Sequence, residues 1–438
     1  MKYFPLFFSC ALLMATSAEC APTRVSLKEA IVHGLMSNAE LRAQRFQERQ
    51  AQSDERLVYG EFGPKIDGLA AVAPIPGATG NSASSSSDMG AWGRMAIAKL
   101  QFTQAIYTWG RKSDYVAAAE KGILVKQGDS QKKEVDVRYD IKEAYYGCLY
   151  AHSLLDFIID GKKDLQKAFE ENNTKKHSSK KENYRLEIFL KQIDEREAEV
   201  RKSYSLAHAG LALRSGWNED VAPVEDWISA KEHTLEPVNY YVSQARVNRV
   251  EFSQLNNGIS AKRSLARAEK RGLLPVLGFG MNYDAAKTNV RPSQPGPYAY
   301  DPYNHWSISV GLGLKLDFAW DIQMAKAEKY EAEAEELEAK GTYAEQGIAL
   351  EVRKAYWEVE EAEKRLKAAG DAYKLGKKWL SGETISYSAG LGKVQDLVEA
   401  YGGRAETVKN YYEAIFKQHL AWAALSKAVG RELETNLQ

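Results

Sequence analysis

The sequence predicts an α+β membrane protein made of a duplicated half, in which each half joins two membrane-spanning β-strands to long coiled-coil helices. Three observations predict this class: an internal repeat, two long stretches without proline, and one segment of strict polar–apolar alternation. The repeat matches Pro64 to Pro275 and Trp109 to Trp320, and 275 − 64 and 320 − 109 both give an offset of 211 residues. A period this long marks a duplicated structural half, since solenoid repeats are much shorter.

The same offset fits the chain without a gap from the pair Glu40/Glu251 to the pair Leu186/Leu397. This offset therefore sets the boundaries between the parts of the chain. We expect a signal peptide at 1–18, a first repeat at 19–214, a connection at 215–236, a second repeat at 237–430 and a tail at 431–438.

The composition excludes several function classes. Charged residues make up 27% of the 438 residues and balance at 59 basic against 59 acidic, so no basic surface for nucleic acid is indicated. The seven histidines are dispersed, and no HExxH or CxxC spacing occurs. No nucleophile elbow or phosphate loop is found either. We expect no enzyme activity, no metal and no cofactor.

The N-terminus has the pattern of a secretory signal. Lys2 gives the positive start, the apolar stretch from Phe4 to Met14 follows, and Thr16 and Ala18 put small residues before a cleavage site. That stretch is too short to span a bilayer as a retained helix, and no later segment is apolar for about 18 residues. Cys20 leaves lipidation open as an alternative to cleavage after Ala18.

The distribution of proline locates the long helices. None of the twelve prolines lies in 77–222 or after 302, and proline breaks helix interiors. An apolar stripe of alternating four- and three-residue spacing starts at Val137 and includes Cys148, which predicts left-handed coiling. Cys148 is therefore expected to be a small core residue and not a reactive thiol. Helices are expected at about 26–60, 110–171, 183–214, 239–272, 321–380 and 394–429.

Residues 306–318 give the clearest strand signal. One side of this strand is expected to face lipid and carries Trp306, Ile308, Val310, Leu312, Leu314, Leu316 and Phe318, and the other side carries Gly, Ser, Lys and Asp. The length suits a tilted membrane strand. A half-buried strand of a soluble sandwich is the alternative. Matching strands are expected at about 65–73, 92–104 and 276–284, with outer loops between the members of each pair.

Four strands cannot close a barrel. An open sheet edge in lipid would leave unpaired backbone N–H and C=O groups that cost several kcal/mol each. The sheet must therefore be completed by further copies of the same chain.

At this point the sequence resembles the outer-membrane efflux (TolC-like) family. The resemblance covers nearly the whole mature chain. It rests on Ser26-Leu27-Lys28-Glu29-Ala30-Ile31, Asn38-Ala39-Glu40-Leu41, Gly63-Pro64-Lys65-Ile66, Gln104 to Arg111, Tyr387-Ser388-Ala389-Gly390, Val394-Gln395-Asp396-Leu397 and a closing helix to Ala428-Val429-Gly430. Each motif alone is loose, but their order, spacing and duplication together are specific.

The resemblance implies a homotrimer in the outer membrane of a Gram-negative bacterium, with a 12-stranded β-barrel and a 12-helix α-barrel that extends through the periplasm. It further implies a passive exit duct of a tripartite efflux or type I secretion system. A periplasmic adaptor (membrane fusion) protein and an inner-membrane pump are the implied partners, and 215–236 would form an equatorial belt. The substrate class, whether drug, metal ion or polypeptide, stays open.

The resemblance also suggests site residues. Asp396 and Glu399 would form a periplasmic gate, and an adaptor-docking tip would comprise Tyr387, Ala389, Gly390, Leu391 and Gly392. The first helix turn departs from the family pattern, because it carries Lys175, Lys176, His177, Lys180 and Lys181. We expect Lys99, Gln101, Lys315 and Asp317 to line the barrel lumen near its periplasmic side. A soluble periplasmic coiled-coil scaffold or adaptor is the competing interpretation.

Overall fold

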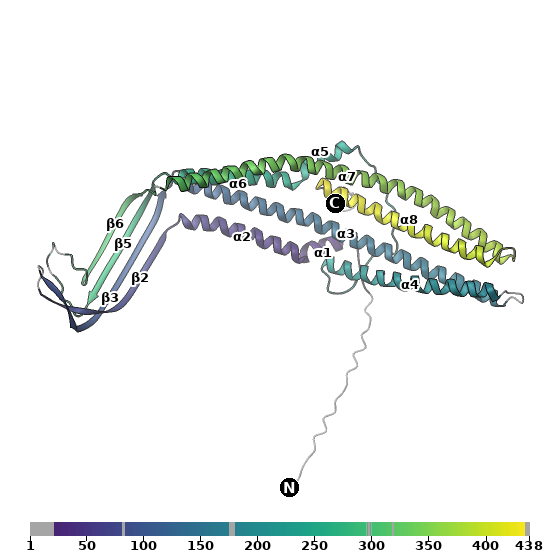
Figure 1. Ribbon diagram of the computed structural model, residues 1–438, viewed down its shortest axis with the longest axis horizontal. Coiled ribbons are helices and arrows are strands. Elements are labelled where there is room, and N and C mark those ends of the chain that lie inside the picture. Colours follow the sequence, from purple (N-terminus) through teal and green to yellow (C-terminus); the bar gives the residue numbers. More distant parts are fainter. Residues whose placement is uncertain are drawn as a thin grey trace, which may run out of the picture.

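The chain forms an elongated body in which a four-stranded sheet at one end continues into a bundle of long helices (Figure 1). The computed structural model describes residues 22–80, 84–174, 180–294, 296, 298, 300–317 and 319–433. The predicted signal peptide, Cys20 and the end of the tail lie outside these residues. None of the described helices is both long enough and apolar enough to cross a membrane.

The strands are β1 (Thr23–Val25), β2 (Lys65–Gly80), β3 (Ser85–Tyr107), β4 (Val221–Pro223), β5 (Val276–Thr288) and β6 (His305–Lys315). The helices are α1 (Leu27–Ser37), α2 (Ala39–Glu61), α3 (Arg111–Thr174), α4 (Lys180–Ser215), α5 (Val238–Asn248), α6 (Val250–Arg271), α7 (Trp320–Ser388) and α8 (Val394–Val429).

The structure divides two helices that the sequence predicts as continuous. The helix expected at 26–60 is interrupted at Asn38, whose side chain accepts a hydrogen bond from the Leu41 N–H at 3.0 Å and starts α2. The helix expected at 239–272 is interrupted at Arg249, which has extended backbone angles. Asn38 and Arg249 are themselves 211 residues apart (249 − 38), so the interruption belongs to the duplicated unit.

The first hairpin is longer than the sequence predicts. The Gly- and Ser-rich stretch expected to be a loop continues the ladder, with Gly77 paired to Asp88 and Gly80 to Ser85. Backbone pairing accounts for this, because strand hydrogen bonds do not depend on large side chains. The last strand is instead shorter than predicted and ends at Lys315, because the chain must turn there to begin α7 at Trp320.

The helices pack side by side as a curved layer. Near the sheet α2 packs on α3, α3 on α6 and α6 on α7, and toward the far end α4 packs on α3, α3 on α8 and α8 on α7. At about 1.5 Å per residue, the 64 residues of α3 span roughly 96 Å. The layer therefore has α2 and α4 at one free edge and α7 at the other.

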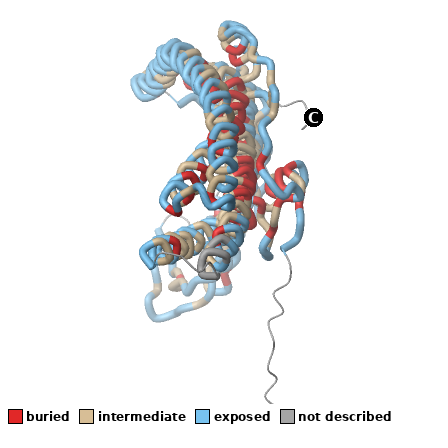
Figure 2. The backbone as a smooth tube through the Cα atoms, turned by 90° about the vertical axis from the view of Figure 1, so that its right-hand side faces the viewer, coloured by how far each residue is buried: buried red, intermediate tan, exposed pale blue. Residues whose placement is uncertain are grey.

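Buried residues gather where the helices contact one another, and exposed residues cover the outside (Figure 2). The predicted apolar stripe is confirmed, since Val137, Ile141 and Cys148 of α3 and Val352 and Val359 of α7 are all buried. Burial raises the pKa of the Cys148 thiol to about 12. This residue is therefore a packing residue, as expected.

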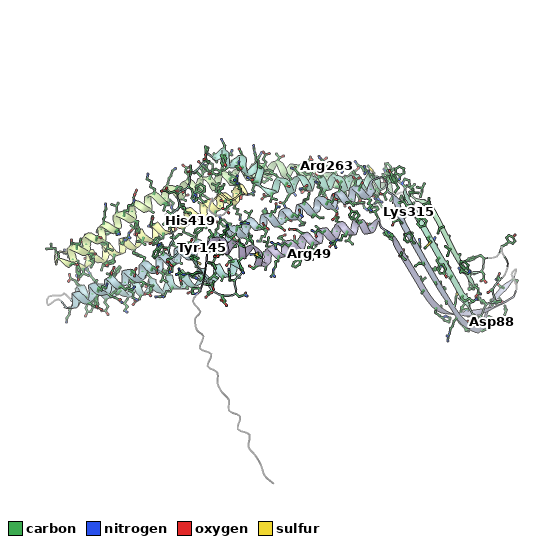
Figure 3. The ribbon with its side chains drawn as sticks, turned by 180° about the vertical axis from the view of Figure 1, so that it is seen from behind. Arg49, Asp88, Tyr145, Arg263, Lys315 and His419 are labelled. Carbon is green, nitrogen blue, oxygen red and sulfur yellow. The ribbon has the colours of Figure 1, made fainter. Side chains whose placement is uncertain are left out.

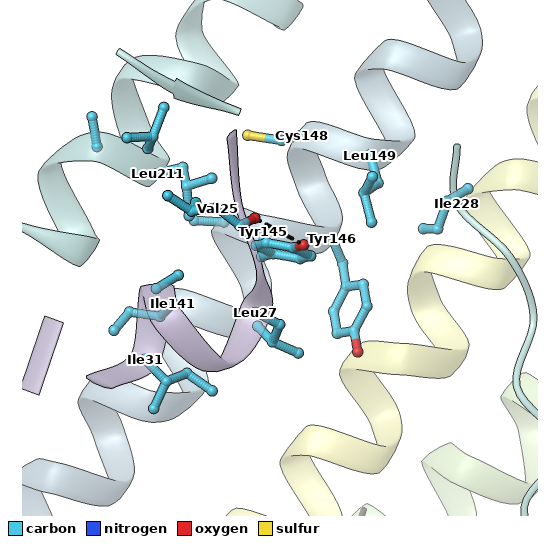
Figure 4. Packing of buried hydrophobic residues seen from close by; sticks show 14 of the residues in the cluster. Val25, Leu27, Ile31, Ile141, Tyr145, Tyr146, Cys148, Leu149, Leu211 and Ile228 are labelled. Carbon is cyan, nitrogen blue, oxygen red and sulfur yellow. Dashed lines mark hydrogen bonds between the residues drawn. The ribbon is translucent and has the colours of Figure 1, made fainter. Parts of the chain in front are cut away.

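Residues 215–236, here called the belt, wrap the middle of the helical body. Its strand β4 pairs in parallel with β1, and the Tyr145 hydroxyl reaches the Val25 carbonyl at 3.2 Å inside the adjoining core (Figure 4). Imidazoles hold the belt backbone: His208 contacts the Val221 carbonyl at 2.7 Å and His419 the Ser229 carbonyl at 2.9 Å. The carbonyl oxygens accept, so each imidazole donates an N–H.

The strand-to-helix corner fixes the sheet relative to the helices. Trp109 and Gly110 both have positive φ (54° and 85°), and the Trp109 indole N–H donates to the Pro275 carbonyl at 2.6 Å. One turn later, buried Asp114 forms an ion pair with Arg271 at 2.8 Å. The end of one repeat's strand pair is thus tied to the start of the other's.

Candidate functional site

The sheet separates an apolar face from a polar face. Its order is β2-β3-β5-β6, and all neighbours are antiparallel. Residues opposite each other in the ladder point to the same side. Val310 lies opposite Met281, and Met281 lies opposite Phe102, which in turn lies opposite Ile66. One apolar row therefore crosses all four strands.

The predicted lipid-facing residues of β6 all lie on this apolar face and are exposed. No other element among the described residues covers them: Ile308 is 60% exposed, Leu312 70% and Leu314 68%. Trp306 and Val310 are exposed as well. Leu316 is exposed but follows the end of the strand, and Phe318 lies outside the described residues.

The opposite face carries polar rows. Asp67, Gln101, Asn282 and Ser309 form one row across the four strands. In the next full row of that face the Lys99 ammonium pairs with the Asp284 carboxylate at 3.1 Å. The His305 imidazole contacts the same carboxylate at 2.6 Å.

The structure places three of the four predicted lumen residues on the polar face: Lys99, Gln101 and Lys315. Lys315 lies at the helix end of β6 (Figure 3), and Asp317 follows the strand. Lys99 lies farther out than expected, four pairs beyond the Lys65–Thr103 pair at the start of the ladder. Sequence reasoning missed Asp67, Asp284 and His305, although Asp67 and Asp284 alternate with apolar residues along their strands.

The two outer strands expose continuous edges. Within the described residues β2 and β6 each have one partner strand only. Helix α2 leads directly into β2, and β6 leads directly into α7. The free edge of the sheet is therefore also the free edge of the helical layer on both sides.

The predicted gate residues lie on the first turns of α8. Asp396 and Glu399 are exposed and three positions apart, whereas Leu397 and Ala400 beside them are buried. Both carboxylates therefore point away from the packed side of the helix.

The predicted docking tip needs one correction. Tyr387 is only 7% exposed and packs with Leu186, Val394 and Leu397, so it joins the two helical hairpins and is not available for docking. Leu391 is 87% exposed at the end of the turn. Gly390 has φ 78°, where glycine carries no steric cost. Ala389 and Gly392 complete the turn.

The first tip is described only in part. Lys180 and Lys181 are exposed at the start of α4, whereas Lys175, Lys176 and His177 lie outside the described residues. A polar contact joins the two tips, because the Arg185 guanidinium donates to the Gln395 side chain at 2.9 Å.

Comparison with known proteins identifies the class to which this architecture corresponds. A layer of long helices that continues into an open, four-stranded sheet is the fold of solved outer-membrane channels. Residues 241–431 match the sequence model of the family described as "Outer membrane efflux protein". No curated protein matches the sequence.

Solved outer-membrane channels share the fold. The Campylobacter jejuni CmeC outer membrane channel superposes with a TM-score of 0.73 at 13% identity, over 99% of this chain and 95% of that one. The Neisseria gonorrhoeae MtrE outer membrane channel gives 0.72 at 15% identity, over 94% and 90%. VceC of Vibrio cholerae gives 0.71 at 14% identity, over 93% and 97%.

The predicted resemblance to the outer-membrane efflux family is therefore confirmed, by sequence over the second repeat and by fold over nearly the whole chain. The predicted outer-membrane location agrees with the family match. Together the two comparisons favour the export channel over the soluble scaffold, since the matched family is one of efflux proteins of the outer membrane.

Proposed function

We propose that three copies of this chain close into a passive exit duct across the outer membrane and periplasm. The observation that carries this proposal is the sheet, with one apolar face, one polar face and two open edges that continue into the helices. The apolar face would contact lipid, and the polar face would line water.

The apolar face is too large for a soluble protein. Burying one large apolar side chain contributes about 1.5–3 kcal/mol. The five exposed residues Trp306, Ile308, Val310, Leu312 and Leu314 therefore forgo on the order of 10 kcal/mol in water. A bilayer supplies that burial. In a soluble scaffold these five side chains would stay exposed to water.

The edges explain the need for other copies. Strand β6 runs toward the helices and β2 runs away from them, so β6 of one copy can pair antiparallel with β2 of the next. A head-to-tail contact of this kind closes into a ring when the rotation between copies allows it. Three copies then give twelve strands, an even number suited to a small barrel.

The second tip would control the periplasmic end. In a three-fold assembly Asp396 and Glu399 form two stacked rings of carboxylates, which favour cations and repel one another. Exposed Leu391 offers an apolar contact for the adaptor, and the pump supplies the energy. In the barrel, the row of Asp67 and Gln101 would contact the exported substrate.

Membrane fractionation and conductance test the proposal. The purified protein should be recovered from the outer-membrane fraction as a detergent-stable trimer and should give ion-conducting channels in planar bilayers. Asp396→Asn together with Glu399→Gln should reduce the preference for cations. Recovery of the full chain as a monomer in the soluble periplasmic fraction would refute the duct.

A further inference from the structure

The side chains at the two free edges carry complementary charges. Arg42, Arg45, Arg49 and Arg56 of α2 are all exposed, and none has an ion pair or side-chain hydrogen bond within the described part of the chain. Figure 3 shows Arg49 on α2 and, across the helical layer from it, Arg263 on α6, the helix next to α7. At 100° per residue the four arginines fall within about 60° of one another, beside the exposed apolar residues Phe46 and Leu57.

The far side of α7 is acidic. Glu328, Glu335 and Glu336 are exposed on the side of α7 turned away from α6. Among the described residues Glu328 and Glu335 have no ion pair, and Glu336 pairs only with Lys340 of its own helix. The glutamates that face α6 are instead paired within the chain, for example Glu338 with Arg263.

The internal duplication shows how these two edges would meet. Helix α6 is the repeat of α2, and α7 is the repeat of α3, so the contact of α3 with α6 inside the chain is a template for α7 against α2 of the next copy. In that internal contact Arg267 of α6 lies 3.3 Å from Asp114 of α3. Moving each residue by the 211-residue offset places Arg56 opposite Ala325.

A second internal contact gives a register that differs from the first by two residues. The Gln254 side chain of α6 donates to Asp129 of α3 at 2.8 Å, and the offset converts this pair to Ala43 opposite Lys340. Because the helices are antiparallel, the first register places Arg49 opposite Ala332 and Arg45 opposite Glu336. Glu328 and Glu335 lie one turn beyond Ala325 and Ala332, within reach of Arg56 and Arg49.

The distances of these residues from the sheet, measured along each helix, agree with this register. Arg49 lies 12 residues before the end of α2 at Glu61, or about 18 Å below the sheet, and Glu335 lies 15 residues after the start of α7 at Trp320, or about 22 Å. Such differences are bridged by long side chains. On the other side of the contact the charges are also complementary, but with the acidic residue on α2. There Asp54 of α2 would face Lys326 of α7.

We propose that the arginine row of α2 pairs with the glutamate row of α7 on the next copy, and that this charged seam fixes the register between copies and selects for copies of the same chain. Charges that flank an apolar stripe set partner choice in coiled coils in the same way. The inference rests on the proposed oligomeric duct and specifies which surface closes it.

A charge swap tests the seam. Arg45→Glu with Arg49→Glu, and separately Glu335→Arg with Glu336→Arg, place like charges across each contact. We expect each double variant to speed subunit exchange between two differently tagged pools by about tenfold at low salt. The combined quadruple variant should return to within about threefold of the original rate. Only a neighbouring copy can rescue it, because α3 and α6 separate α2 from α7 within one chain.

The matched control is the swap Arg263→Glu with Glu338→Arg, which exchanges an ion pair inside one chain and should leave the exchange rate unchanged. Double variants that exchange subunits at the parent's rate, or a quadruple variant that is not rescued, would overturn the seam and leave the duct intact. A parent protein that is monomeric would instead refute the duct itself.

Cysteine pairing provides a readout that does not depend on exchange. In a Cys20→Ser background, Arg49→Cys with Glu335→Cys should oxidise to covalent dimers and trimers on a denaturing gel, since the remaining native Cys148 is buried. The pair Arg263→Cys with Glu335→Cys should give no such ladder. Ladders from the control pair alone would also contradict the proposed register.

Discussion

Acidification should loosen the belt at His419. Its imidazole is 2% exposed, stacks on Tyr146 at 3.9 Å and donates to the Ser229 carbonyl. Burial lowers the pKa of His419 to about 4, and the nearby charges of Lys231, His233 and Lys142 add to this, against the opposing effect of the Ser229 carbonyl. Lys142 is itself paired with Glu432 at 2.6 Å.

The sign follows from linkage. An imidazole whose folded pKa lies below its unfolded value near 6.5 is held neutral, so its contribution to stability is complete above pH 6.5 and is lost as the pH falls toward 4. The difference of about 2.5 units corresponds to about 3 kcal/mol per copy at 1.36 kcal/mol per unit. Below pH 4 the imidazole is protonated in the folded protein as well, so the free energy of unfolding falls no further.

Unfolding at several pH values measures this. His419→Gln keeps an N–H for the Ser229 carbonyl but cannot titrate, so the stability difference between the parent and this variant should shrink by about 3 kcal/mol between pH 7 and pH 4. Amide exchange at Ser229 should rise over the same window. An NMR titration that gives His419 a pKa near 6.5 would refute the reasoning, as would equal pH dependence in the two proteins.

Three further predictions concern the barrel, the tip and the corner. Val310→Arg places a charge on the apolar face and should destabilise the inserted barrel by about 2–4 kcal/mol, whereas Ser309→Arg on the polar face should be tolerated. The two variants are compared by the amount of folded protein recovered from the outer membrane. Equal losses would contradict the assigned faces. Tyr387→Ala empties a buried contact between the hairpins and should cost about 3 kcal/mol locally, which conductance of the resting channel should report as increased leak; an unchanged conductance would show that this contact does not hold the tip closed. Gly110→Ala adds a Cβ at φ 85° about 2.2 Å from the Arg271 guanidinium and should lower the free energy of unfolding by about 1–3 kcal/mol, as thermal melting would show; an unchanged melting temperature would mean that the corner is not strained.

The sequence predicts most of the architecture because its strongest signals are periodic. The spacing around Val137 and Val352 determines a coiled seam, and the alternation at Ile308 determines a two-faced strand, whatever the neighbours are. The structure agrees with both. The same two signals also located the free apolar face, which is the feature most important for function.

Other features depend on contacts that no local pattern reveals. The helix interruptions at Asn38 and Arg249 involve neither proline nor glycine, so the helical pattern runs through them. Gly77 and its neighbours have loop-like composition but are held in a ladder by backbone pairing. Tyr387 resembles a surface docking residue until the other hairpin is seen to cover it.

The duplication predicts positions more reliably than it predicts the residues that occupy them. Each repeat has one place where a returning helix ends beside the start of another helix, and its last carbonyls need donors. In the first repeat His33 and Ser37 both contact the Ser215 carbonyl, at 2.7 and 3.2 Å. In the second repeat the Arg249 guanidinium donates to the Ala428 carbonyl at 3.1 Å.

The tips differ in the same way, since the first is basic and the second carries Asp396 and Glu399. A ring of three copies would therefore alternate basic and acidic tips around its periplasmic end, although the helices that present them are equivalent. The gate proposed above is formed by the second tips, so the constriction should respond to Asp396 and Glu399 and not to Lys180 and Lys181. Lys180→Gln with Lys181→Gln should accordingly leave cation preference unchanged in bilayer conductance. A change as large as that of the carboxylate variants would show that both hairpins form the gate.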